Sequence, residues 1–384
     1  MGLKLFSSRV KFDRHEWAGS FGDIGTDFPL ITGMILASGL DVCSVCVMFG
    51  VMQIVMGFIY GLPMPIQPLK AMAVIVITQK LSPDILYGGG LAIGVVMLVL
   101  SVSGLINWIA RIIPKCVIRG IQFGLGMQLS TLALKDYVQS DGISGYGLAL
   151  LSFLIIIFLL GNRKCPPALL VILLGFIYAF VFKINPDAFA NSIGFNLPHF
   201  HVPTPGDILT GLLILALPQL PLSIGNSVLA TKQVVADYFP ERSLSVRKIS
   251  LTYSLMNLIK PFFSGIPVCH GSGGIAGHYT FGARTGGSVV LYGLLYLLVG
   301  LFFSTGFDTV IQLFPKPMLG VILMFEGIAL MRLIQDIKEI KKELVIALMV
   351  GLMAVSLPYG YVVGLLVGTI LNYLTQKAVI KLGE

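Results

Sequence analysis

The chain has 384 residues, of which 56% are hydrophobic and only 11% are charged. A soluble domain carries roughly 25% charged residues because its surface faces water, so this composition excludes an ordinary soluble protein. The formal net charge of +8 comes from basic residues scattered among short connections. A nucleic-acid-binding protein gathers such residues into one patch, so we do not expect nucleic acid as a partner.

Residues 1–18 form a polar lead-in that contains Lys4, Arg9, Lys11 and Arg14. They include no apolar run that ends in small residues, so they do not resemble a cleavable signal peptide. We expect this lead-in to lie in the cytoplasm.

Apolar stretches then follow one another almost to the end of the chain. A helix that spans a membrane needs about 20 apolar residues, and on this basis we expect about 14 segments. They are 19–38, 41–61, 65–80, 86–109, 113–135, 146–160, 166–183, 207–230, 246–263, 270–281, 286–304, 309–331, 343–357 and 359–376. The predicted fold class is therefore an all-α polytopic membrane protein.

The orientation follows from the basic residues. With both termini in the cytoplasm, the cytoplasmic connections receive most of the 26 Lys and Arg residues, as the positive-inside rule requires. A proline-rich connection from Lys183 to Gly206 separates a first half, 19–206, from a second half, 207–384. Seven segments in each half would give the halves opposite orientations, as in inverted-repeat transporters.

Four stretches interrupt the helical pattern with Pro and Gly, in the first and third segments of each half. They are 22–29, 63–70, 218–227 and 267–274. Because Pro removes a helix hydrogen bond, we expect all four to be unwound. Unwound backbone inside a membrane must be buried in protein or line a wet cavity, and in transporters it lines the substrate site. The alternative is that these residues only kink helices or allow close packing.

The third segment of each half is too short to cross alone, so we expect half-helices over Gln67–Ile77 and Ser272–Tyr279, the third and tenth segments, with their starts meeting at the midplane. A helix N-terminus offers unpaired N–H groups and a partial positive charge. Two of them would bind an anion through Gln67, Ser272, Gly273 and Gly274.

Ionisable residues within the apolar segments are costly and usually functional. They are Asp23, Asp27, Lys70, Lys260, His270 and Glu326. Asp23 either pairs with Lys70 or takes up a proton together with the anion, because protonation relieves both repulsion and desolvation. Glu326 and then His270 are the further proton-coupling candidates, each with a structural alternative, a helix-packing hydrogen bond or a helix cap.

We expect no cofactor and no metal site. Cys43 and Cys46 are spaced like a redox or zinc pair, but no second pair or neighbouring His accompanies them. We expect the five cysteines to act mainly as small packing residues. The histidines show no HExxH spacing, which argues against a membrane-embedded metalloenzyme.

The interrupted stretches resemble the molybdate transporter family that is related to the sulfate permeases. The matching motifs are FGDIGTDFP from Phe21, PMPIQPLK from Pro63, QLPLSIGNS from Gln219 and CHGSGGIAGHYTFGARTG from Cys269. This resemblance implies a seven-plus-seven inverted topology, a core domain of segments 1–4 and 8–11, a gate domain of segments 5–7 and 12–14, and molybdate uptake. It also implies an oxyanion site formed by Asp23, Thr26, Gln67, Lys70, Gln219, Asn226, Ser272, Gly273 and Gly274, with Arg284 at the cytoplasmic end of segment ten.

The leading hypothesis is a secondary active transporter in the plasma or inner membrane, with molybdate as substrate and proton coupling as a further hypothesis. Alternatives are a sulfate or tungstate transporter, a nucleobase/proton symporter of the same fold, an anion channel and a membrane-embedded enzyme. A homodimer is a further possibility that the resemblance raises.

Overall fold

The computed structural model describes residues 10–106, 108, 112–160, 167–183 and 193–380, and the described chain is mostly helical. The first half contains α2 (Arg14–Ser20), α3 (Ile24–Ser38), α4 (Val42–Tyr60), β1 (Ile66–Pro68), α5 (Lys70–Gln79), α6 (Pro83–Ser103), α8 (Lys115–Leu132), α9 (Gly142–Leu159) and α10 (Pro167–Phe182). The second half contains α12 (Pro205–Gly211), α13 (Leu217–Leu222), α14 (Thr231–Tyr238), α15 (Val246–Ile259), β2 (Val268–His270), α16 (Ser272–Thr280), α17 (Gly287–Phe302), α18 (Ser304–Leu313), α19 (Lys316–Arg332), α20 (Lys341–Ser356) and α21 (Gly360–Gln376).

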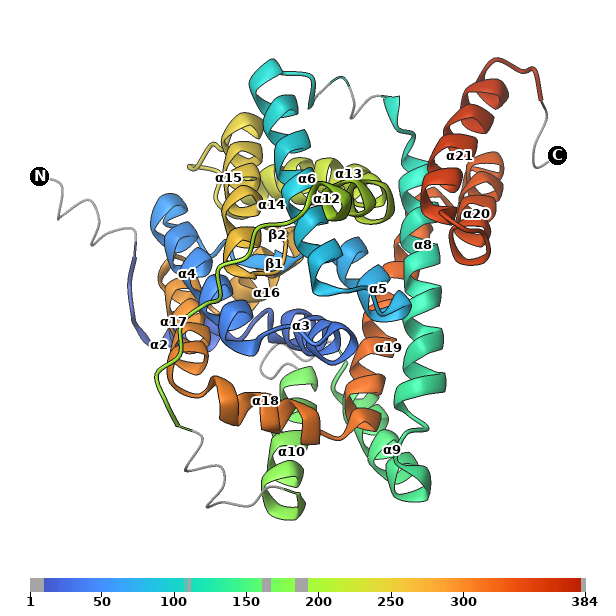
Figure 1. The fold of residues 1–384 in the computed structure, drawn as a ribbon. Coiled ribbons are helices and arrows are strands. Elements are labelled where there is room, and N and C mark those ends of the chain that lie inside the picture. The colour runs from blue at the N-terminus through green and yellow to red at the C-terminus, as the bar shows by residue number, and fades with distance from the viewer. Residues whose placement is uncertain (1–9, 107, 109–111, 161–166, 184–192, 381–384) are drawn as a thin grey trace, which may run out of the picture.

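The helices form two packed groups (Figure 1). In one group, α4 packs against α17 and α6 packs against α15 and α12. In the other, α8 packs against α19, α20 and α21. β1 packs against α4 and β2 against α15, so both strands lie within the first group (Figure 1).

The two short strands pair antiparallel, with Gln67 opposite Cys269. A side-chain amide from a neighbouring helix completes each strand. Gln53 of α4 exchanges two hydrogen bonds with the backbone of Ile66, at 2.9 and 3.0 Å. Asn257 of α15 does the same for Val268, at 2.7 and 2.9 Å. These bonds satisfy buried backbone groups that a helix would otherwise satisfy internally.

Extended peptide therefore precedes both short helices, as the sequence predicted. The ten-residue helix α5 begins at Lys70 rather than at Gln67, because Gln67 belongs to β1. The nine-residue helix α16 begins at Ser272, as expected.

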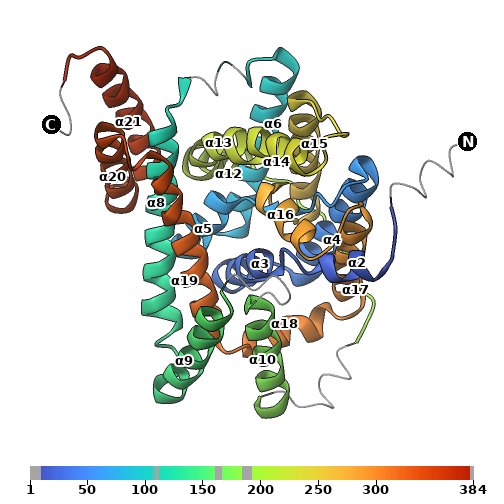
Figure 2. The same ribbon diagram turned by 180° about the vertical axis from the view of Figure 1, so that it is seen from behind.

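The prediction that residues 218–227 are unwound is wrong. Residues Pro205–Tyr238 form one continuous helical stretch of 34 residues, which runs across the molecule as α12, α13 and α14 (Figure 2). π-Helical turns at Leu212–Ala216 and Ser223–Ala230 flank the prolines Pro218 and Pro221. Such turns adjust the hydrogen-bond register around prolines without ending the helix.

The prediction for residues 22–29 is only partly correct. The break between α2 and α3 covers Phe21–Asp23, and helix α3 already includes Pro29. The predicted segment 309–331 is also divided, because α18 ends at Leu313 and α19 begins at Lys316. Helix α18 bends away from α17 by 99°.

Several helices are suited to a lipid environment. Within the described residues, five helical stretches are long and apolar enough to cross a membrane, namely Val42–Tyr60, Pro83–Ser103, Gly142–Leu159, Pro205–Tyr238 and Lys316–Ile337. Large apolar side chains such as Leu150, Phe158 and Val181 of α9 and α10 face outward. Outward apolar side chains are stable in lipid and costly in water.

The N-terminal helix α2 is fastened to the start of α17. Glu16 is 2% exposed, and its carboxylate accepts hydrogen bonds from the backbone N–H groups of Arg284, Thr285 and Ser288, each at 2.9 Å. A carboxylate at a helix N-terminus satisfies unpaired donors and complements the helix dipole.

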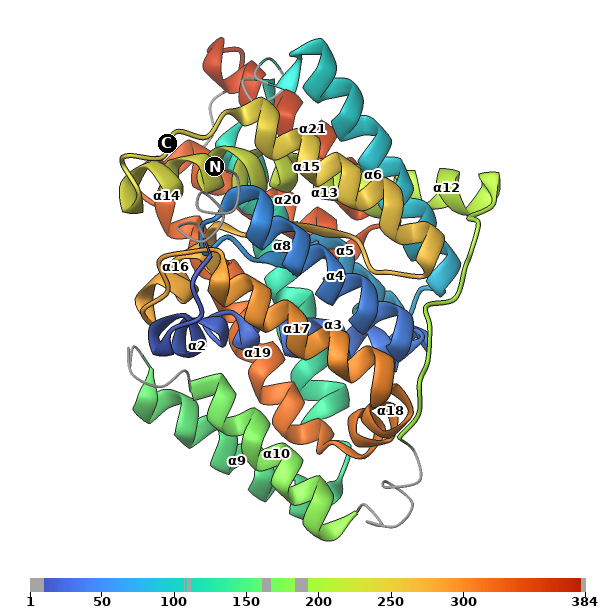
Figure 3. The same cartoon turned by 90° about the vertical axis from the view of Figure 1, so that its left-hand side faces the viewer.

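An extended segment connects the two halves. Its described part leads into α12 along one edge of the molecule (Figure 3). The backbone N–H groups of His199 and His201 donate to Ser44 Oγ and to the carbonyl oxygen of Phe262, both at 2.9 Å. Pro186 and Cys165 lie outside the described residues. The described cysteines Cys43, Cys46, Cys116 and Cys269 are buried and free.

Candidate functional site

A cavity of about 370 Å³ lies where the two short helices begin. It is lined by Gln67, Lys70, Arg119, Gln219, Leu222, Asn226, Ser227, Ala230, Cys269, His270, Gly271, Ser272, Gly273, Glu326, Ala329, Leu330 and Leu333. The structure therefore brings six of the predicted substrate-binding residues to one cavity: Gln67, Lys70, Gln219, Asn226, Ser272 and Gly273.

The start of α16 opens into this cavity. Gly271 is its N-cap residue and provides no side-chain cap. Gly273 borders open space, because a Cβ added to it would have no neighbour within 4 Å. The first N–H groups of a helix have no partner within the helix, so those of α16 are available to an anion in the cavity.

Asp23 lies behind this surface and is paired with Gln67 rather than with Lys70. The Gln67 side-chain amide donates to both carboxylate oxygens of Asp23, each at 2.7 Å, and Asp23 is 4% exposed. A Cβ on Gly274 would lie 2.5 Å from an Asp23 oxygen, and one on Gly271 would overlap Gln67. The two glycines are thus needed for the close approach of this pair to α16.

Lys70 and Thr26 meet at Glu326. The Lys70 ammonium lies 3.9 Å from the Glu326 carboxylate, and the Thr26 hydroxyl donates to the same carboxylate at 3.1 Å. Glu326 is on α19, whereas Thr26 and Lys70 are on α3 and α5. One carboxylate therefore links the two helix groups beside the cavity.

The start of α5 is already capped. The side-chain oxygen of Gln219 accepts hydrogen bonds from the N–H groups of Ala71 and Met72, at 2.9 and 3.3 Å. The Gln219 amide nitrogen donates to Ser223 at 3.1 Å. The two helix starts are therefore not equivalent, since no side chain of the described residues caps α16 in this way.

Other predicted residues lie around the cavity or away from it. His270 contributes to the lining but is fully buried, and its Nε2 shares a hydrogen bond of 2.7 Å with Thr252 Oγ1. Asp27 and Lys260 are fully buried and are absent from the cavity wall. Arg284 lies outside the cavity, with its guanidinium carbon 3.7 Å from the ring centroid of Tyr279.

Sequence reasoning missed Arg119. This arginine of α8 lines the cavity and is ion-paired with Asp336. Arg119 lies far along the chain from the interrupted stretches. No local pattern in the sequence therefore connected it with the site.

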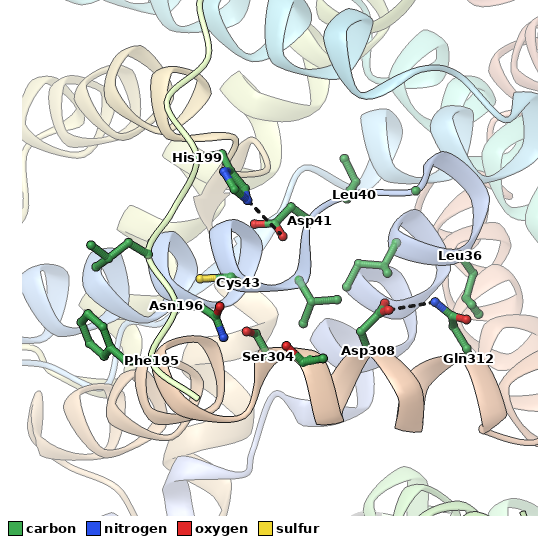
Figure 4. Close-up of a pocket in the computed structure, with 15 residues that line it drawn as sticks. Leu36, Leu40, Asp41, Cys43, Phe195, Asn196, His199, Ser304, Asp308 and Gln312 are labelled. Atoms are coloured by element: carbon green, nitrogen blue, oxygen red, sulfur yellow. Dashed lines mark hydrogen bonds and ion pairs between the residues drawn. The ribbon is translucent and has the colours of Figure 1, made fainter. Parts of the chain in front are cut away.

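A larger cavity of about 760 Å³ lies elsewhere, beside α4, α18 and the connecting segment (Figure 4). Its polar side chains include Asp41, close to His199, and Asp308, which accepts a hydrogen bond from Gln312 (Figure 4). Its described lining residues include two carboxylates and no Lys or Arg, which makes it a poor anion site.

The chain matches the family model described as molybdate transporter of MFS superfamily over residues 15–129 and 211–330. It is 32% identical to Molybdate transporter 2 of Arabidopsis thaliana, with 84% of this chain and 79% of that protein covered. It is also 32% identical to Molybdate transporter 1 of the same plant, covering 93% and 87%. These relatives are transporters, in agreement with the expectation that the chain is not an enzyme.

Solved structures share the fold. The transmembrane domain of the cyanobacterial bicarbonate transporter BicA superposes with a TM-score of 0.65 at 16% identity, covering 93% of this chain and 96% of that one. The murine anion transporter Slc26a9, in its inward-facing state, gives 0.74 at 12% identity, covering 99% and 71%. With its apolar helices and these relatives, the chain is an integral membrane protein that belongs to the molybdate transporter family.

Proposed function

We propose that this protein is a secondary active transporter of a tetrahedral oxyanion, with molybdate as the first candidate and tungstate and sulfate next. The observation that carries the proposal is the uncapped start of α16, which opens beside Lys70 into a cavity. The names of the relatives, both molybdate transporters, favour molybdate among the oxyanions.

The proposed binding mode uses the N–H groups of Ser272, Gly273 and Gly274. These donors and the helix dipole attract negative charge, and Lys70 adds a positive charge when Glu326 is protonated. Asn226 and the Ser272 hydroxyl are further hydrogen-bond donors at the cavity. Gln67 holds Asp23, and Gln219 holds the start of α5, so these two residues position the site rather than bind the anion.

We propose an inverted repeat of residues 19–206 and 207–384, with the short helices α5 and α16 starting near the membrane midplane. The matched pairs Gln53–Ile66 and Asn257–Val268 support it, because corresponding helices of the two halves use an amide for the same task. The gate domain would then correspond to the group of α8, α19, α20 and α21. The core domain would correspond to the group that carries α5 and α16. The basic residues favour both termini in the cytoplasm.

We propose proton coupling through Glu326 in preference to Asp23 or His270. Glu326 lines the cavity next to Lys70, whereas Asp23 is buried behind Gln67. An ionised Glu326 neutralises Lys70 and repels an incoming anion. Protonation removes both effects, so proton and anion would bind cooperatively.

Uptake of labelled molybdate into proteoliposomes tests the proposal. We expect saturable uptake that tungstate and sulfate inhibit and that increases as the external pH falls. Inhibition by uracil or xanthine instead would indicate a nucleobase symporter, and non-saturating currents would indicate a channel.

A further inference from the structure

Arg119 reaches the substrate cavity from a different part of the fold than Lys70 and Ser272. It belongs to α8, which packs against α19, α20 and α21. Its side chain is 14% exposed, whereas that of its partner Asp336 is 44% exposed. Asp336 is absent from the cavity lining. Arg119 therefore contributes to the cavity wall, whereas its counterion does not.

The hydrogen-bond donors near Arg119 are only partly used. Its Nη1 donates to the side-chain oxygen of Gln122 at 2.8 Å, and its Nη2 donates to Asp336. The Nε of Arg119 and the side-chain nitrogen of Gln122 are buried and have no acceptor among the described residues. Buried donors normally have acceptors, and a tetrahedral oxyanion brings four acceptor oxygens.

The charge of the cavity also depends on Arg119. Among the described residues that line it, the charged side chains are Lys70, Arg119 and Glu326. Lys70 and Glu326 lie 3.9 Å apart, and while Glu326 is ionised the two largely neutralise each other. Arg119 is then the source of net positive charge that a dianion would meet, and a guanidinium is well matched to the oxygens of an oxyanion.

Asp336 can release Arg119 at modest cost. Its side chain is 44% exposed, so water can reach the carboxylate. Lys115 lies 3.5 Å from Asp336, so the carboxylate keeps one cationic neighbour and contact with water after Arg119 leaves.

From this arrangement we infer that Arg119 is a ligand of the transported oxyanion, and that Asp336 holds the guanidinium until the substrate replaces it. The inference rests on the proposed function and adds a residue from the α8 group to the α16 start and Lys70. An anion held by both groups would bring them together during transport.

Equilibrium binding of labelled molybdate to the full-length protein in lipid nanodiscs at low ionic strength tests this inference. We expect Arg119→Gln to weaken binding about tenfold or more, because a charge-assisted, forked contact is lost. Arg119→Lys should weaken it less, since it keeps the charge. Asp336→Asn should strengthen binding by a factor of about two to five. Lys115→Gln, the matched control, removes another partner of Asp336 that does not line this cavity, and it should stay within about twofold of wild type.

The expected affinity changes of Arg119→Gln and Asp336→Asn have opposite signs, and this distinguishes a ligand role of Arg119 from a purely structural one. If the pair only joins α8 to the turn after α19, Arg119→Gln and Asp336→Asn will lower affinity and melting temperature together, which overturns the inference. Unchanged affinity in both Arg119 variants also overturns it. A wild-type protein that binds no molybdate would instead refute the proposed function, and this inference with it.

Discussion

The side-chain oxygen of Gln219 lies 2.9 Å from the backbone nitrogen of Ala71 and caps the start of α5. An anion site at two equivalent helix starts would need both starts to be free. Because a protein side chain already caps α5, the anion is expected to bind mainly at α16. Gln219 comes from the continuous stretch α12–α14, so the same bond fixes α5 against that stretch.

Replacing Gln219 with Ala should therefore destabilise the protein by about 1–2 kcal/mol, the usual cost of losing a helix cap. The measurement is the thermal unfolding temperature of the purified protein. Gln233→Ala is the matched control, because Gln233 is exposed and its side chain bonds to exposed Asp237. Equal melting temperatures for the two variants would show that the cap contributes no stability.

Glu326→Gln should remove the pH dependence of molybdate uptake and leave uptake near its low-pH rate. The neutral amide resembles the protonated acid, which does not repel the substrate. The matched variant Asp23→Asn should keep the pH dependence, because Asp23 does not line the cavity. Loss of pH dependence in Asp23→Asn alone would transfer the proposed proton site to Asp23.

Glu16→Ala should lower stability by roughly 2–4 kcal/mol, because it leaves three backbone N–H groups at the start of α17 without their acceptor, and each buried unsatisfied donor costs about 1–3 kcal/mol unless water reaches it. Thermal unfolding again measures the change. Glu241→Ala provides a control, since Glu241 is exposed. A Glu16 variant as stable as the control would mean that water readily replaces the carboxylate.

The sequence predicted those features that depend on local chemistry. A preceding helix does not continue through the glycines of Gly271 to Gly274 or the prolines before Lys70. The extended peptides and the start of α16 at Ser272 could therefore be predicted. The prediction failed at Pro218 and Pro221, because π-helical turns allow the helix to pass both prolines.

Long-range partners were not readable from the sequence. Asp23 bonds to Gln67 and not to Lys70, the pair that was one of the two alternatives for Asp23, and Lys70 instead lies near Glu326. These choices depend on how α3, α5 and α19 pack, and no local pattern encodes that packing. The same reason explains why Arg119 was not recognised as part of the cavity.

The most direct test of the central claim is labelled molybdate uptake by proteoliposomes that contain wild type, Gly273→Leu or Gly147→Leu. A side chain at either glycine would start in open space, so both variants should fold, but only that at Gly273 enters the cavity at the start of α16. We predict saturable, tungstate-inhibited uptake for wild type and Gly147→Leu, and at least about a tenfold loss for Gly273→Leu. Wild-type uptake no greater than that of empty liposomes, or a Gly273→Leu protein that transports like wild type, would contradict the account.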